Sequence, residues 1–153
     1  MRSPVLVSVA ATLAGLALAG CGSSGGSLLT ASELASQGSA ICERTRSEEN
    51  ALQVQNAQGM RLAIPRLEEI GERELTDLSK LSAPASEQRS YHELLKTGSE
   101  INALLKPLSS ALATDGSPPP ELLAHGRELT SRLAALAGHL DMSSCSASSS
   151  PAV

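Results

Sequence analysis

Apolar residues, most of them leucine and alanine, recur every three or four positions in four stretches of the chain. This spacing places them on one face of an α-helix, whereas a strand would alternate at every second residue. The pattern predicts helices over about residues 30–55, 60–81, 84–113 and 118–140, with no strand and no internal repeat. We therefore expect an all-α fold.

The ends of these stretches carry helix-start and turn signals. Thr30 and Glu33 match a capping box, in which each of the two side chains accepts a hydrogen bond from the other residue's backbone N–H. Residues 114–120 (Thr-Asp-Gly-Ser-Pro-Pro-Pro) form the clearest turn, with Ser117 as the expected N-cap of the last helix. Connections between the predicted helices are therefore short.

Two prolines fall inside predicted helices, and proline lacks the backbone N–H that a helix interior requires. Pro65 either marks the first turn of the second helix or kinks a helix that began earlier. Pro107 lies within the third stretch, where we expect a bend or a break.

The apolar stripes identify the side chains that face a common core. The inward positions are Leu34, Gly38, Ile41, Cys42, Thr45 and Leu52; Leu67, Ile70, Glu74 or Leu75, Leu78 and Leu81; Tyr91, Leu94, Leu95, Gly98, Ile101, Leu105, Leu108 and Leu112; and Leu122, Gly126, Leu129, Leu133, Leu136 or Ala137, and Leu140. Four amphipathic helices with short connections favour an antiparallel, up-down-up-down four-helix bundle.

The first 21 residues have the pattern of an export signal. Residues 1–4 include one basic side chain. Residues 5–17 are Val, Leu, Ala and small residues without charge, a run shorter than the roughly 20 residues that cross a bilayer as a helix. Leu18-Ala19-Gly20-Cys21 resembles the lipobox of bacterial lipoproteins, in which the cysteine receives a diacylglycerol and the chain is cut before it. An ordinary signal peptide with an incidental cysteine, or an uncleaved anchor, is the alternative.

The lipobox resemblance implies how the chain is divided and where it is found. Residues 1–20 would be a lipoprotein signal peptide, and Cys21 would be the lipidated first residue of the mature protein. Residues 21–29 contain a Gly/Ser-rich run expected to act as a flexible tether, residues 30–145 form the helical domain, and residues 146–153 are an expected disordered tail. We therefore expect a lipid-anchored protein on the extracytoplasmic face of the cell membrane.

Composition narrows the classes of partner. The chain has no Trp or Phe and only one Tyr, Tyr91, so leucine and alanine must fill the core, which favours helices. The formal net charge is −4, and the sequence has no basic stripe of the kind that binds nucleic acid. The expected partners are the membrane, through the lipid on Cys21, and a protein of the cell envelope.

The cysteine count bears on the fold. If Cys21 is lipidated, Cys42 and Cys145 remain as an even pair in an exported, oxidising setting, and a disulfide is expected between them. Two free buried thiols are the alternative. In an up-down-up-down bundle the end of the fourth helix returns beside the first, where this bond would form.

Few residues are arranged for catalysis or metal binding. His125 and His139 are about 21 Å apart along one helix at 1.5 Å per residue, too far to share a metal ion. Glu121 lies one turn from His125, but two ligands do not make a site. We expect no catalytic residue, metal or cofactor, and we expect the remaining candidates to lie on solvated helix faces: His92, Glu48, Glu49, Glu68, Glu69 and Glu72.

Three features of the mature part resemble small exported proteins of actinobacteria. They are Ala40-Ile41-Cys42 in the first helix, residues 81–85 (Leu-Ser-Ala-Pro-Ala) before a helix that carries Tyr91, and a cysteine just past the last helix. Residues 43–46 (Glu-Arg-Thr-Arg) depart from the Ala- and Asn-rich run expected in that group. The resemblance implies a helical bundle with a cysteine near each end, and it implies no activity.

These observations favour a non-enzymatic, membrane-tethered interaction or binding module of the cell envelope. The alternative is a binder of a small apolar ligand or lipid, in a cleft between helices opened by Pro65, Pro107 and the glycines. An enzyme is the least favoured class, because no group of residues meets the requirements of a recognisable reaction.

Overall fold

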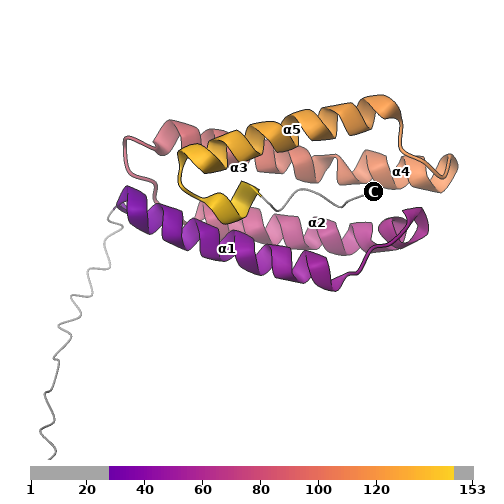
Figure 1. The fold of residues 1–153 in the computed structure, drawn as a ribbon, viewed down its shortest axis with the longest axis horizontal. Coiled ribbons are helices and arrows are strands. Elements are labelled where there is room, and N and C mark those ends of the chain that lie inside the picture. Colours follow the sequence, from indigo (N-terminus) through magenta and orange to yellow (C-terminus); the bar gives the residue numbers. More distant parts are fainter. Residues whose placement is uncertain (1–27, 147–153) are drawn as a thin grey trace, which may run out of the picture.

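A computed structural model of the chain, which describes residues 28–146, consists of α-helices joined by short connections (Figure 1). The elements are α1 (Ala31–Ala51), α2 (Ala57–Ser79), α3 (Gln88–Ala103), α4 (Leu105–Thr114), α5 (Pro120–His139) and the 3-10 helix η1 (Ser143–Ser146). No strand occurs in this part of the chain, so the all-α prediction is confirmed there. The predicted signal peptide, Cys21 and residues 147–153 lie outside the described residues.

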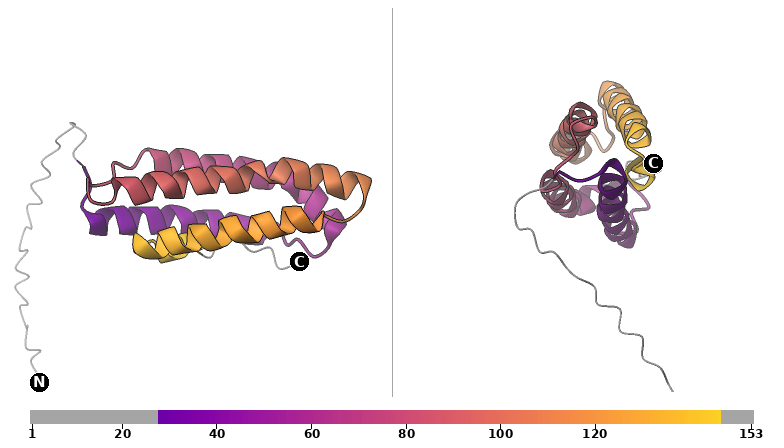
Figure 2. Two further views of the ribbon diagram at one scale, coloured as in Figure 1. Left: turned by 90° about the horizontal axis from the view of Figure 1, so that it is seen from above. Right: turned by 90° about the vertical axis from the view of Figure 1, so that its left-hand side faces the viewer.

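The helices lie side by side along a common long axis (Figures 1 and 2). α1 packs on α2, α2 packs on both α3 and α4, and α3 packs on α5. η1 contacts both α5 and α1, so it links the last long helix to the first. The first and last elements of the domain therefore meet through this short segment.

The observed helix starts confirm one predicted cap and resolve the question of Pro65. Thr30 N–H donates to Glu33 Oε2 at 2.8 Å and Glu33 N–H donates to Thr30 Oγ1 at 3.2 Å, which is the predicted capping box. Asn56 caps α2 by accepting from the N–H of Gly59 at 2.8 Å. Because α2 begins at Ala57, three residues before the predicted start, Pro65 lies within the helix and on its exposed side.

The third and fourth predicted helices differ from expectation at their ends. Residues 84–87 form a turn, and α3 begins only at Gln88. The helix then breaks at Leu104, as expected near Pro107, because proline has no N–H to donate to the carbonyl four residues earlier. The prediction that Ser117 caps the last helix is wrong: the cap position is Pro119, which makes no side-chain cap, and α5 starts at Pro120.

The end of α5 directs the chain back toward α1. Met142 N–H donates to the carbonyl of Ala137 at 2.8 Å and Asp141 N–H donates to that of Gly138 at 3.3 Å, which is the pair of bonds of a Schellman motif. Asp141 has a positive φ of 54°, where glycine is usual. Met142 is fully buried, and a Cβ on Gly38 would lie 2.2 Å from its Cε. Glycine at position 38 therefore allows the return segment to pack closely on α1.

Replacing Asp141 by glycine is expected to stabilise the protein by about 0.5–1 kcal/mol, because glycine adopts the left-handed conformation without steric cost. The free energy of unfolding from urea titrations checks this. Asp115 has a negative φ of −111° at the end of α4, and glycine there should destabilise or have no effect. A loss of stability in Asp141→Gly would show that the side chain, rather than the backbone, is important at this turn.

Most of the buried apolar side chains form two clusters, and Ile70 and Leu129 are buried outside both. The larger surrounds the return segment and consists of Leu34, Cys42, Leu78, Ala83, Tyr91, Leu94, Leu133, Ala137, Leu140, Met142 and Cys145. The smaller consists of Met60, Ile64 and Leu112. It lies near the start of α2 and the end of α4. The apolar core is thus divided along the length of the domain.

Candidate functional site

Cys42 and Cys145 are joined by a disulfide, as expected from the cysteine count. Their sulfur atoms are 2.02 Å apart, their Cα atoms are 5.0 Å apart, and both residues are buried. Cys42 lies on the inward face of α1, and η1 carries Cys145 to it. Because both cysteines are buried, the bond is typical of a structural disulfide.

The three histidines lie apart on the surface of the domain. His125 Nδ1 is 3.9 Å from Glu128 Oε2, and His139 Nε2 is 3.7 Å from Glu87 Oε2. His92 is exposed on α3. Among residues 28–146 no three His, Cys, Asp or Glu side chains come together as a metal site would require.

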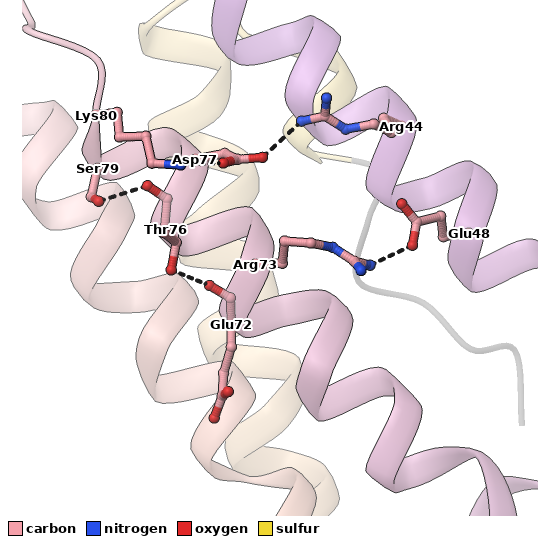
Figure 3. Close-up of polar contacts among 8 residues, drawn as sticks. All are labelled: Arg44, Glu48, Glu72, Arg73, Thr76, Asp77, Ser79 and Lys80. Carbon is pink, nitrogen blue, oxygen red and sulfur yellow. Dashed lines mark hydrogen bonds and ion pairs between the residues drawn. The ribbon is translucent and has the colours of Figure 1, made fainter.

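Ion pairs join the exposed faces of α1 and α2 (Figure 3). Arg44 donates to Asp77 at 3.0 Å, and Arg73 donates to Glu48. The hydrogen bond from Lys80, and then the charges of Lys80 and Arg44, lower the pKa of the Asp77 carboxyl. Because these pairs are exposed to solvent, each contributes at most about 1 kcal/mol and mainly sets how the two helices align.

Two other carboxylates lie between the apolar clusters. Glu49 is two turns beyond Cys42 on α1, and Glu74 is one turn before Leu78 on α2. Both side chains are half-buried, unlike the exposed Glu72. The expectation that Glu49 belongs to a solvated face is wrong, because it continues the inward stripe of α1 one turn after Thr45.

Burial changes the acidity of these two groups. Desolvation raises the pKa of Glu49 to about 7. It also raises the pKa of Glu74 to about 7, and the nearby charge of Glu49 adds to the effect. Carboxylates are ordinarily ionised near neutrality, whereas these two are partly protonated there.

Two threonines accompany the carboxylates inside the domain. Thr45 is 5% exposed, and Thr97 on α3 is fully buried. The Thr97 hydroxyl has no hydrogen-bond partner among the described residues. We call Thr45, Glu49, Glu74 and Thr97 the polar layer, to which the three helices α1, α2 and α3 contribute.

A shallow depression lies at the end of the domain where α1 begins. Its volume is about 250 Å³, and its lining includes Leu28, Leu81, Tyr91, His92 and Leu95. The Tyr91 hydroxyl donates to the carbonyl of Leu78 at 2.6 Å, which fixes the ring beneath the depression. Burial raises the pKa of Tyr91 to about 12, so the phenol stays protonated.

None of the helices within residues 28–146 is both long and apolar enough to cross a bilayer. No family model, no curated protein and no solved structure matches the chain. The resemblances to lipoproteins and to actinobacterial exported proteins therefore stay predictions from their motifs.

Proposed function

We propose that the chain is a membrane-anchored lipoprotein on the extracytoplasmic face of the cell membrane, and that its helical domain is a non-enzymatic interaction module. The observation that carries the proposal is the lipobox at residues 18–21 after a short apolar run. The buried bond between Cys42 and Cys145 supports it, because structural disulfides persist mainly in exported, oxidising compartments.

We further infer that the helices form an antiparallel, up-down-up-down four-helix bundle in which α3 and α4 together make the third rod. The order of packing supports this, since consecutive helices are neighbours and η1 completes the circuit to α1. Such a domain presents four outer helix faces to a partner in the cell envelope.

The helical domain offers more support for binding than for catalysis. His125 and His139 have different carboxylate neighbours, and the half-buried Glu49 and Glu74 lie on α1 and α2 away from all three histidines. A protein partner, recognised by an outer face, is therefore the partner class that we propose. Crosslinking of intact membranes, followed by capture of the anchored protein, should return the same envelope protein in repeated experiments.

Replacing Cys21 by alanine is expected to abolish membrane attachment, because no thiol remains for acylation. In the host cell, intact-mass measurement of the unaltered protein should show a mature chain that begins at Cys21 and carries diacylglycerol. Fractionation should find the unaltered protein with membranes, where acyl chains contribute about 0.8 kcal/mol per buried methylene.

Ser24→Ala, three residues further along, is the matched control for this substitution and should leave attachment unchanged. An unmodified Cys21 in the unaltered protein, or equal membrane association of Cys21→Ala through a different route such as an uncleaved signal, would contradict the lipoprotein assignment.

A further inference from the structure

The depression at the start of α1 is uncharged, although 18% of the chain is charged. Its lining contains no Asp, Glu, Lys or Arg; it combines the apolar Leu28, Leu81, Ala83 and Leu95 with the uncharged polar groups of Ser82, Gln88, Tyr91 and His92. A surface without charged side chains avoids the large cost of removing ionised groups from water when it approaches a lipid bilayer. This property distinguishes the depression from the ion-paired faces of α1 and α2.

The residue that follows the exposed leucine at the edge of the depression is anchored to the domain. Leu29 N–H donates to the carbonyl of Ser82 at 2.8 Å, and the Leu29 side chain packs on the larger apolar cluster. Leu28, the residue before it, is 58% exposed. The loop between α2 and α3 thus anchors the backbone next to an exposed apolar side chain at this end of the domain.

The number of residues between Cys21 and Leu28 limits how far the depression can lie from the anchored cysteine. Cys21 is seven residues before Leu28, and seven residues span at most about 25 Å. The 21 residues of α1 extend about 30 Å away from Leu28 toward the other end of the domain. With Cys21 in the membrane, Leu28 at the edge of the depression lies within about 25 Å of the bilayer, whereas the connection between α1 and α2 lies at the other end of the domain (Figure 1).

We propose that Leu28 and the depression beside it form a contact surface for the lipid of the membrane to which Cys21 is anchored, an inference that rests on the proposed lipoprotein function. Leu28 inserts among the lipid chains near the headgroups, and the uncharged lining faces the interface. Since the protein has a net charge of −4, the contact is apolar and does not need anionic lipid. The helical domain therefore rests on the membrane at a defined end.

Tyr91 provides a direct probe, because it is the only aromatic residue of the chain and lines the depression. The mature chain, residues 21–153, is coupled through the Cys21 thiol to a maleimide phospholipid in phosphatidylcholine vesicles. Some vesicles also contain a phospholipid with a nitroxide near the headgroup, which quenches fluorescence at short range. We expect the nitroxide to reduce Tyr91 emission by at least half, equally at low and high salt.

Two matched variants separate lipid contact from simple proximity. Leu28→Glu should recover most of the Tyr91 emission, whereas Leu62→Glu, at an exposed leucine near the far end of the domain, should be quenched like the unaltered protein. Circular dichroism shows that both variants are folded. Equal quenching of the unaltered protein and Leu28→Glu would overturn the proposal, as would quenching that disappears at high salt.

The chemical coupling makes the vesicle result independent of acylation in cells. If Cys21 proves unmodified in the host, the proposed function fails even where the quenching is as expected. If Cys21 is acylated and Leu28→Glu is quenched as strongly as the unaltered protein, only the contact surface fails.

Discussion

Replacing both Cys42 and Cys145 by alanine is expected to lower the free energy of unfolding by about 4 kcal/mol. The bond joins residues 103 positions apart, and closing a loop of this size removes much of the entropy of the unfolded chain. A domain of this size has a total stability of only about 5–15 kcal/mol. Urea titrations followed by circular dichroism measure the loss, and the larger apolar cluster, which contains both cysteines, should be disrupted first.

Two comparisons test whether the loss comes from the disulfide. Adding a reductant to the unaltered protein should reproduce most of the loss, and the same reductant should have no effect on the double variant. Cys21→Ser, outside the helical domain, should retain the full stability. A loss of less than about 1 kcal/mol in the double variant would show that packing alone holds η1 against α1.

Replacing both Glu49 and Glu74 by glutamine is expected to stabilise the protein by about 2 kcal/mol at pH 8 and to have little effect near pH 4. Burial raises the pKa of each carboxyl to about 7 in the folded state, against an ordinary value near 4.5. Between about pH 4.5 and 7 the folded protein binds more protons than the unfolded chain, so its stability falls as the pH rises. Above pH 7 both states are ionised, and the cost of two half-buried charges remains.

The partial exposure of the two carboxylates keeps the expected gain small. A pKa shift of one unit in one group corresponds to about 1.4 kcal/mol. The expected gain of about 2 kcal/mol is well below the sum of the two full pKa shifts, because each side chain retains contact with water, which weakens the effect. The free energy of unfolding is measured from pH 4 to 8 for the variant and for the unaltered protein. The difference between the two proteins at each pH cancels the contribution of the other carboxylates, which both proteins share. Glu43→Gln and Glu72→Gln, exposed on the same two helices, form the control pair. A difference that does not change with pH would show that the two carboxylates are solvated.

The helical class and much of the core were predictable from the sequence because leucines recur at helical spacing with few exceptions. The capping box at Thr30 was also predictable, since its two hydrogen bonds involve residues three positions apart. The turn at Asp141 was not, because a positive φ is usually marked by glycine, and here it is imposed by the packing of Met142 and the disulfide beyond it. Ser117 failed as a cap because three prolines follow it and delay the helix.

Half of the polar layer was missed: Thr45 was expected to face inward and Glu74 was one of two inward candidates, but Glu49 and Thr97 were not identified. Glu49 lies one turn after Thr45 and three residues before Leu52, which is the spacing of an inward position. Thr97 precedes Gly98, and the stripe of α3 was assigned to the glycine although the threonine is the buried one. Helical spacing alone would have identified these side chains, whereas their raised pKa values depend on how α1 and α2 pack together.

The disulfide also determines how the molecule would respond to mechanical load. A pull applied between Cys21 and Val153 would pass along the chain from residue 21 to Cys42, through the sulfur–sulfur bond, and from Cys145 to the C-terminus. The 103 positions that separate the two cysteines would carry no tension, and α2, α3, α4 and α5 all lie within them. Only the first half of α1 and the last residues of η1 would be stretched, so the greater part of the fold is shielded from force on its two ends.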